Sequence, residues 1–189
     1  MNAPILREVT EELRTPRLVL RRPRAGDGLT VREAVVESLE ALRAWPASLP
    51  WAMQEPTVEA SEVFCRESAA DFVKRTLLAY FAFERESDRF VASCSLHRID
   101  WAVPKFEMGF WCRTSRHRRG YATEAVSCLA QYALGPLGAR RVECVVDEEN
   151  RACRGLCEKI GMRLEGVLRN ERVTPDGQLR NTCIYAIAR

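Results

Sequence analysis

The chain has 189 residues, of which 47% are hydrophobic and 29% are charged, and its formal net charge is +3. These values fit one soluble globular domain with its own core, so we expect a single domain over residues 1–189, with residues 1–12 as a flexible N-terminal segment. The near-balanced charge argues against a nucleic-acid-binding protein, and no apolar run is long enough to span a membrane. The charged residues between Arg7 and Glu12 leave no apolar core for a signal peptide, so we expect a cytoplasmic protein.

The first half of the chain alternates strand-like and helix-like patterns. Pro23 ends a first apolar stretch, and a capping box at Thr30–Glu33 indicates the start of a helix. A proline-rich segment carrying Trp51 separates this helix from the next. The predicted elements are a strand at 15–23, a helix at 30–45, a loop at 47–56, a helix at 57–74, and strands at 77–84 and 90–99.

The second half continues with strands that alternate with helices. Gly135–Gly138 interrupts the chain, and Gly161 supplies a typical helix stop. The predicted elements are strands at 106–112, 141–146, 164–173 and 179–188 and helices at 123–134 and 150–160. This pattern is typical of the α/β class, with helices inserted into a meander of strands.

Eight cysteines are spread along the chain without a Cys-x-x-Cys pair or a regular framework. Cys153 and Cys157 are four residues apart and would share a helix face, which is one possible metal pair. The two histidines, His97 and His117, lack ligand spacing to that pair. We therefore expect reduced structural cysteines and no metal site.

The segment Arg116–Ala125 lies between a predicted strand and a predicted helix. Backbone N–H groups at a helix start lack internal partners, and the helix dipole adds positive charge there. Gly120 allows a ligand to approach the backbone closely, because it has no side chain. Formal charge is added by nearby arginines, namely Arg113, Arg116, Arg118 and Arg119. The segment therefore predicts a binding site for a phosphorylated cofactor.

Four motifs in order resemble the GNAT superfamily of acyl-CoA-dependent N-acyltransferases, and within it the RimJ/RimL type. The motifs are Leu13–Arg21, Met108–Trp111 followed by Gly120–Ala125, Asn150 with Glu158–Met162, and Glu165–Arg169 with Asp176-Gly177. The resemblance extends from about Leu13 to the C-terminus. It implies a mixed, mostly antiparallel sheet of about seven strands flanked by helices, and acetyl-CoA as the acyl donor.

The resemblance also implies which residues bind the cofactor. The turn and first helical residues would hold the coenzyme A pyrophosphate, and these are His117, Arg118, Arg119, Gly120, Tyr121, Ala122 and Thr123. The strand end at Phe110, Trp111 and Cys112 would separate from its neighbour and offer backbone groups to the pantetheine arm. One of its amides would stabilise the oxyanion. Asn150 would face the thioester end. The turn departs from the family at His117 and Arg118, since Gln or Arg is usual at the first position and glycine is common at the second.

Catalysis requires an amine to lose a proton before it attacks the thioester. Glu107 lies on the strand beside the expected thioester site, where many relatives keep a carboxylate base. The alternative is a polar residue on a half-exposed strand. Cys153 stands where the branch often has serine, and it is a candidate acid or thiolate-side partner, or else a packed helix cysteine. Cys157 stands where other branches have a tyrosine acid.

Other residues have less specific roles. Trp45 and Trp51 either line an acceptor pocket or pack over the core, and His97 is expected as a strand surface residue. We expect an acetyl-CoA-dependent N-acetyltransferase in which a primary amine attacks directly in a ternary complex. The acceptor is a protein N-terminus or a small amine, and the protein is a monomer or a homodimer. The alternatives are a non-catalytic acyl-CoA sensor and a basic RNA-associated module.

Overall fold

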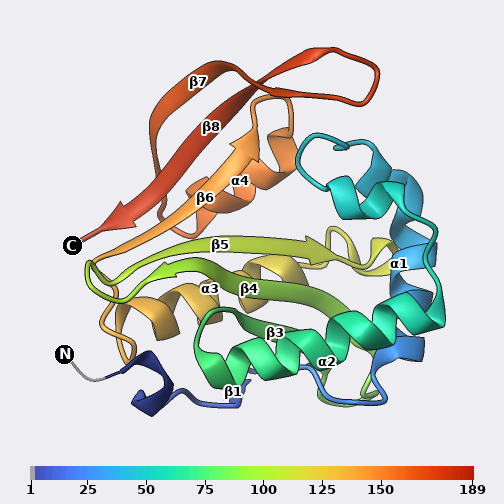
Figure 1. Cartoon of the computed structure of the whole chain (residues 1–189), viewed down its shortest axis with the longest axis vertical. Coiled ribbons are helices and arrows are strands. Elements are labelled where there is room, and N and C mark those ends of the chain that lie inside the picture. Colours follow the sequence, from blue (N-terminus) through green and yellow to red (C-terminus); the bar gives the residue numbers. More distant parts are fainter. Residues whose placement is uncertain (1–2) are drawn as a thin grey trace.

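A single eight-stranded sheet forms the centre of the protein (Figure 1). The computed structural model describes residues 3–189. The strand order is β1-β2-β3-β4-β5-β6-β8-β7, and every neighbouring pair is antiparallel except β5 and β6. The strands are β1 (Glu12–Arg14), β2 (Leu18–Arg21), β3 (Leu78–Glu84), β4 (Phe90–Asp100), β5 (Lys105–Cys112), β6 (Arg141–Asp147), β7 (Arg163–Val173) and β8 (Leu179–Ala188). The predicted α/β class and the mixed, mostly antiparallel sheet are confirmed, with one more strand than expected.

The additional strand is β1, which pairs with β2 across a tight turn. The sequence predicted one strand over residues 15–23, whereas residues 15–17 form the turn. The Thr15 amide donates to the Leu18 carbonyl at 2.9 Å, and the Leu18 amide donates to the Thr15 hydroxyl at 2.9 Å. Pro16 has no N–H to contribute to a ladder, so a strand could not continue through it.

Four α-helices connect and cover the strands. They are α1 (Gly28–Arg43), α2 (Val58–Lys74), α3 (Tyr121–Leu134) and α4 (Arg151–Lys159), and short 3-10 helices lie at Pro4–Leu6 (η1), Pro50–Met53 (η2) and Thr114–Arg116 (η3). The predicted capping box at Thr30–Glu33 is wrong, because α1 already begins at Gly28. Across residues 3–189, no helix has the length and apolarity needed to cross a lipid bilayer.

The free backbone amides at the start of α1 find their hydrogen-bond acceptor in a distant part of the chain. The Gly26 and Gly28 amides donate to the Glu62 carboxylate of α2 at 2.9 Å and 3.1 Å. Asp27, the residue that precedes the helix, is held by Arg21 through two hydrogen bonds. A local capping residue is therefore unnecessary, and the helix starts where α2 supplies the acceptor.

The sheet is buried on both faces at its central strand β3, whereas β7 at one edge is mostly exposed. On β3, Tyr80 and Ala82 pack into the core under α3 and α4, while Phe81 and Phe83 pack into the core under α1 and α2. This alternation follows from the period of two along a strand. In Figure 1, α2 passes in front of the sheet and α3 lies behind it.

Helices α1 and α2 meet closely at Gly28. A Cβ atom at this position would lie 2.7 Å from the Cβ atom of Glu62, which is closer than such atoms approach. We predict that Gly28→Ala lowers the free energy of unfolding by about 1–3 kcal/mol, because the helices must move apart. Urea unfolding followed by circular dichroism measures this. Gly155→Ala in α4 is the matched control, since nothing lies within 4 Å of its added Cβ, and it should not destabilise the protein. Equal stability of the two variants would contradict the packing argument.

Candidate active site

Strands β5 and β6 are paired only at their beginnings. Their register is Lys105↔Arg141, Phe106↔Val142 and Glu107↔Glu143, and no pair follows. Strand β5 nevertheless continues to pair with β4 as far as Cys112. The backbone of β5 after Glu107 therefore has no strand partner on its β6 side, except that the Met108 carbonyl accepts the Cys144 thiol at 3.1 Å. The residues predicted to bind pantetheine, Phe110, Trp111 and Cys112, lie in this separated part.

A cavity of about 1160 Å³ opens on the α1/α2 side of this separation. The segment that includes Trp45 and Trp51 lines it, and so does the β7–β8 hairpin through Arg172 and Val173. Arg172 Nη1 donates to the Ser48 hydroxyl at 3.1 Å and thereby joins the hairpin to that segment. Among the predicted site residues, those that line the cavity are Glu107, Phe110, Trp111, Asn150 and Cys153. Residues 117–123 are absent from its lining.

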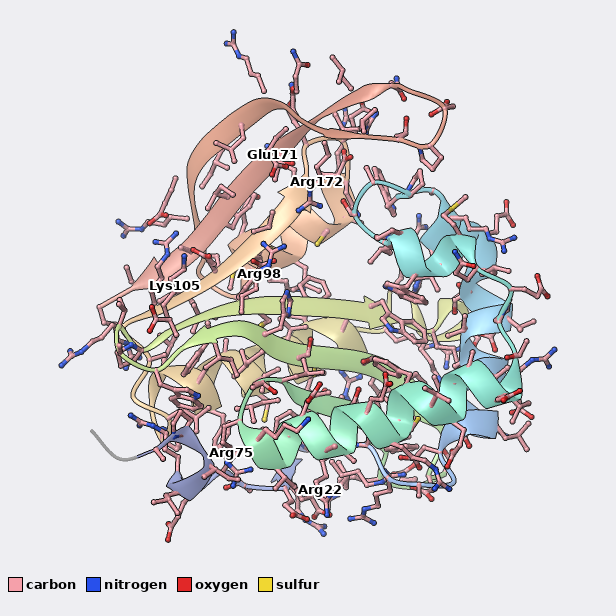
Figure 2. All side chains as sticks on the ribbon, viewed as in Figure 1. Arg22, Arg75, Arg98, Lys105, Glu171 and Arg172 are labelled. Carbon is pink, nitrogen blue, oxygen red and sulfur yellow. The ribbon has the colours of Figure 1, made fainter. Side chains whose placement is uncertain are left out.

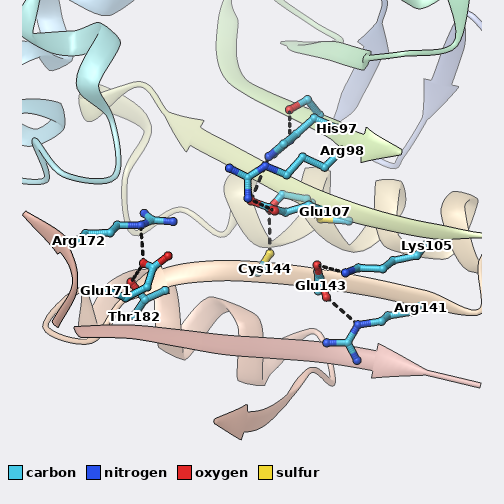
Figure 3. Close-up of polar contacts among 12 residues, drawn as sticks. His97, Arg98, Lys105, Glu107, Arg141, Glu143, Cys144, Glu171, Arg172 and Thr182 are labelled. Atoms are coloured by element: carbon cyan, nitrogen blue, oxygen red, sulfur yellow. Dashed lines mark hydrogen bonds and ion pairs between the residues drawn. The ribbon is translucent and has the colours of Figure 1, made fainter. Parts of the chain in front are cut away.

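Glu107 is buried at the inner end of this cavity, with 8% of its surface exposed. Its Oε1 lies 3.2 Å from His97 Nε2, and its Oε2 accepts from Arg98 Nη1 at 3.0 Å (Figure 3). Burial alone would raise the pKa of Glu107. The hydrogen bonds with His97 and Arg98 and the charge of Arg98 outweigh burial, so the pKa of Glu107 lies below its usual value. Glu107 is therefore a buried carboxylate held in its ionised form, which excludes the half-exposed alternative.

His97 has a different environment from the one the sequence predicted. It was expected on the strand surface, but it lines the cavity, contacts Glu107 and keeps 33% of its side chain exposed. The register of the β4–β5 hairpin places His97 directly opposite Glu107. Recognising this hairpin register in the sequence would have brought the two residues together.

Arg98 reaches Glu107 because β4 contains a bulge. The β4–β5 register shifts between His97 and Asp100, and Arg98 has a left-handed φ of 46°. In a regular strand, neighbouring side chains point to opposite faces of the sheet. The bulge turns Arg98 so that both it and His97 meet the same carboxylate, while 73% of the Arg98 side chain remains exposed.

Two further buried carboxylates on β6 line the cavity, and the sequence analysis missed both. Glu143 is paired with Lys105 at 2.9 Å and with Arg141 at 2.6 Å (Figure 3). Asp147 accepts two hydrogen bonds from Arg180, at 2.7 Å and 3.0 Å. Burial would raise the pKa of Asp147, but the hydrogen bonds from Arg180 and from a backbone amide outweigh it and lower the pKa. Glu143 and Asp147 are four residues apart on β6 and therefore share one face of the sheet, and this spacing could have indicated from the sequence that both line one site.

Asn150 and Cys153 form the first turn of α4. Asn150 Oδ1 accepts from the Cys153 amide at 3.0 Å, so its side chain caps the helix. A hydrogen bond with Cys157 and burial raise the pKa of the Cys153 thiol well above its ordinary value. This thiol is therefore a poor nucleophile and keeps its proton. Within residues 3–189, no group of three or more His, Cys, Asp or Glu side chains could hold a metal ion.

The turn before α3 exposes a series of free backbone donors. Helix α3 begins at Tyr121, two residues earlier than predicted, and Gly120 precedes it with a φ of 78°. Arg118 also has a left-handed φ, of 57°. For the described part of the chain, the amides of residues 118–123 donate to no protein acceptor. The turn thus combines free amides with the positive end of the α3 dipole, which is the arrangement an anion requires.

The arginines around this turn have two kinds of role. Arg118 and Arg119 are exposed and make no ion pair with any residue in 3–189. Arg113 and Arg116 are neutralised by acidic side chains from other elements. The pairs are Arg113–Glu37 at 2.6 Å and Arg116–Glu84 at 3.3 Å. Of the four arginines that the sequence assigned to the anion site, two therefore stabilise the turn instead of adding net charge.

Comparison with known proteins gives the family. The model of the acetyltransferase (GNAT) domain matches residues 17–163, and the chain belongs to this family. The uncharacterized N-acetyltransferase YoaA of Bacillus subtilis is 28% identical over 105 residues, which are 56% of this chain and 59% of YoaA. The uncharacterized N-acetyltransferase p20 of Bacillus licheniformis is 29% identical over 86 residues, which are 46% of this chain and 48% of p20. The chain thus spans about half the length of the curated relatives it matches.

Solved structures of acetyltransferases share the fold. A putative ribosomal-protein-serine acetyltransferase from Vibrio cholerae has a TM-score of 0.79 and 21% identity, over 94% of this chain and 97% of the other. The RimL ribosomal L7/L12 α-N-protein acetyltransferase with coenzyme A has a TM-score of 0.82 and 15% identity, over 94% and 98%. MccE, a microcin C7 self-immunity acetyltransferase solved with acetyl-CoA and AMP, has a TM-score of 0.79 and 20% identity, over 93% and 94%. Membership of the family confirms the predicted acetyltransferase domain.

The turn before α3 is open to a direct test. We predict that Gly120→Trp lowers the affinity for coenzyme A at least about tenfold, because the side chain fills the turn and φ at this position is positive. Isothermal titration calorimetry with coenzyme A measures the effect. Gly138→Trp is the control, because Gly138 has a comparable φ of 69° but lies beyond the other end of α3. Unchanged coenzyme A affinity in Gly120→Trp would place the site elsewhere.

The Asp147–Arg180 pair makes a pH-dependent contribution to stability. The pKa of Asp147 is lower in the folded protein than its value of about 3.9 in unfolded chains, so the stabilisation is complete above that value and disappears as the pH falls through the folded pKa. We predict that Asp147→Asn costs about 1–3 kcal/mol at pH 7 and progressively less below pH ~4. Urea titrations at pH 7 and at acid pH measure the difference. A cost that is equal at both pH values would contradict the role of the charge.

Proposed function

We propose that the protein transfers the acetyl group of acetyl-CoA to a primary amine by direct attack in a ternary complex. The observation that carries this proposal is the buried, ionised Glu107 with His97 beside it, at the point where β5 leaves β6. A thioester placed in this separation would meet an amine that enters from the cavity on the α1/α2 side. The two substrates then approach from opposite faces of the sheet.

The His97–Glu107 pair is suited to accept the proton of the amine. An amine is mostly protonated at neutral pH and attacks only after it loses a proton. His97 is the more exposed member, at 33% against 10% for the Glu107 side chain, so the imidazole meets the amine and the carboxylate orients it. The amine nitrogen then bonds to the carbonyl carbon, the carbon–sulfur bond breaks, and the coenzyme A thiolate leaves. Free amides in the separated part of β5 would hold the oxyanion.

We assign the leaving thiolate to the α4 side of the cavity. Cys153 lines the cavity and carries a protonated thiol, so it can donate a hydrogen bond to the departing sulfur. A covalent acyl-cysteine route is disfavoured by the same raised pKa, because a thiol is a far weaker nucleophile than a thiolate. The pyrophosphate is assigned to the free amides of residues 118–123 together with Arg118 and Arg119.

The acceptor class and the location of the protein are also part of this proposal. A protein N-terminus is supported by the solved relatives, one described as a putative ribosomal-protein-serine acetyltransferase and another as an L7/L12 α-N-protein acetyltransferase. A small amine remains the alternative acceptor. All eight cysteines are free thiols, which suits the reducing cytoplasm. The proposed mechanism can operate in a monomer or in a homodimer.

The role of Glu107 gives a test of this mechanism. We predict that Glu107→Gln lowers kcat about 10²-fold or more, because a neutral amide neither accepts the proton nor supports His97 as a base. The dissociation constant of acetyl-CoA should stay unchanged, as measured by calorimetry. Turnover is followed by release of free thiol with a panel of amines.

Glu143→Gln is the matched control, because Glu143 is about as buried as Glu107 and lies on the neighbouring strand. Its carboxylate forms ion pairs with Lys105 and Arg141 and has no role in the proposed mechanism. It should retain turnover. If acetyl-CoA binds tightly but the unaltered protein turns over no amine, the protein is an acyl-CoA sensor instead of an enzyme. Equal loss of kcat in both variants would contradict a specific role for Glu107.

A further inference from the structure

Residues of β3, β4 and β5 line one side of the cavity, which we call its floor, and their character changes from charged to aromatic along it. Glu107, Gly109 and Trp111 are every second residue of β5, so their side-chain positions share one face of the sheet. Their partners on β4 are His97, Ser95 and Ser93, respectively, and Ser93 is in turn opposite Phe81 on β3. All these residues line the cavity. The floor therefore runs from a charged end at Glu107, across small residues, to an aromatic end at Trp111 and Phe81.

The aromatic end is a continuous row of five rings. Neighbouring ring centroids are 5.4–6.4 Å apart along the sequence of contacts Trp51–Trp111–Phe90–Phe81–Phe64. The inner rings of Phe81 and Phe90 are fully buried, whereas Trp51 and Phe64 at the two ends are each 44% exposed. Both exposed rings line the cavity. Apolar surface that remains uncovered inside a cavity is stabilised when a ligand covers it.

The part of the floor between Glu107 and Trp111 is lined by small residues, which leaves room above it for a ligand. Ser93, Ser95 and Gly109 are the smallest residues of the floor, and a Cβ atom at Gly109 would lie 3.0 Å from His97 Cε1. Glu107 and Trp111 are four residues apart, which is about 13 Å along a strand. An extended chain can therefore lie on this floor between the charged end and the aromatic end.

The charges of the cavity disfavour a polycation. Glu107, Glu143 and Asp147 are each neutralised by basic side chains. Two arginines also line the cavity, Arg98 from β4 and Arg172 from the β7–β8 hairpin (Figure 2). Of the other acidic side chains in the lining, Glu171 is paired with Arg172 at 3.2 Å and Glu55 is exposed to solvent. A polyamine or an aminoglycoside would bring several ammonium groups to a cavity whose buried carboxylates are already paired.

We propose that the acceptor is a monoamine that carries an aromatic or large aliphatic group about 7–13 Å from its amino group. The amine lies at His97 and Glu107, and the apolar group covers Trp51 and Phe64. This inference rests on the proposed N-acetyltransferase function. Two sources share this chemistry: a peptide N-terminus with an aromatic residue near position three, and a small arylalkylamine.

An acceptor panel tests the inference. The probes are Ala-Gly-Phe-amide, Ala-Gly-Gly-amide, 4-phenylbutylamine and spermidine, each assayed with acetyl-CoA for release of free thiol. We expect kcat/KM for Ala-Gly-Phe-amide to exceed that for Ala-Gly-Gly-amide at least about tenfold, a difference of about 1.4 kcal/mol. Preference for the peptide over 4-phenylbutylamine identifies a protein N-terminus, and the reverse identifies a small aromatic amine. Equal rates for both peptides, or faster turnover of spermidine, would overturn the inference.

Two variants link the preference to the rings. Trp51→Ala and Phe64→Ala should remove the advantage of Ala-Gly-Phe-amide, mainly through KM, and Trp51→Phe should restore part of it. Val63→Ala is the control, because Val63 is 48% exposed on the same helix as Phe64 but does not line the cavity. A preference that survives in both alanine variants would contradict the assigned site.

Failure of the proposed function has a separate signature, namely no turnover of any probe. Calorimetric binding of Ala-Gly-Phe-amide to the protein saturated with coenzyme A then tests the inference alone. Binding that is weakened in Trp51→Ala supports the aromatic subsite, and binding unaffected by that substitution overturns it.

Discussion

The early end of the β5–β6 ladder is the constraint on which the rest of the site depends. Three residue pairs join these two strands, which among residues 3–189 are the only parallel neighbours in the sheet. Continued pairing would have used the backbone groups of β5 internally and closed the passage between the two faces of the sheet. Because the strands separate at Glu107, the same point provides free amides, an opening, and a buried carboxylate beside the opening.

Buried charge is the cost of this arrangement, and the chain offsets it with basic residues from several elements. The partner of Glu107 comes from β4, the partners of Glu143 come from β5 and from β6 itself, and the partner of Asp147 comes from β8. A buried carboxylate without such partners would take up a proton and lose its use as a base or as an orienting group. The pairing therefore keeps the carboxyl groups of Glu107 and Asp147 ionised, as the proposed mechanism requires of Glu107.

The sequence was most informative where the cause of a structure is local. Periodicity predicted most helix and strand limits to within two residues, and α2 and α4 begin next to Thr57 and Asn150, whose side chains cap them. It failed where the cause lies far along the chain. The start of α1 depends on Glu62, and the charges of Arg113 and Arg116 are neutralised by Glu37 and Glu84. The partnership of His97 with Glu107 required the hairpin register, and the contribution of Arg98 required a bulge that no local pattern indicates.

The turn before α3 is joined to the beginning of the domain. Arg17, in the β1–β2 turn, donates to the Arg119 carbonyl at 3.0 Å and to Glu124 at 2.6 Å, while its guanidinium lies over the Tyr121 ring. Thr15 also donates to Glu124, at 2.6 Å. Strands β1 and β2 are short and lie at the edge of the sheet, where local opening is least costly. A ligand that orders the turn would therefore also hold this hairpin in place, so that binding at the proposed pyrophosphate site and ordering of the sheet edge would be one cooperative event.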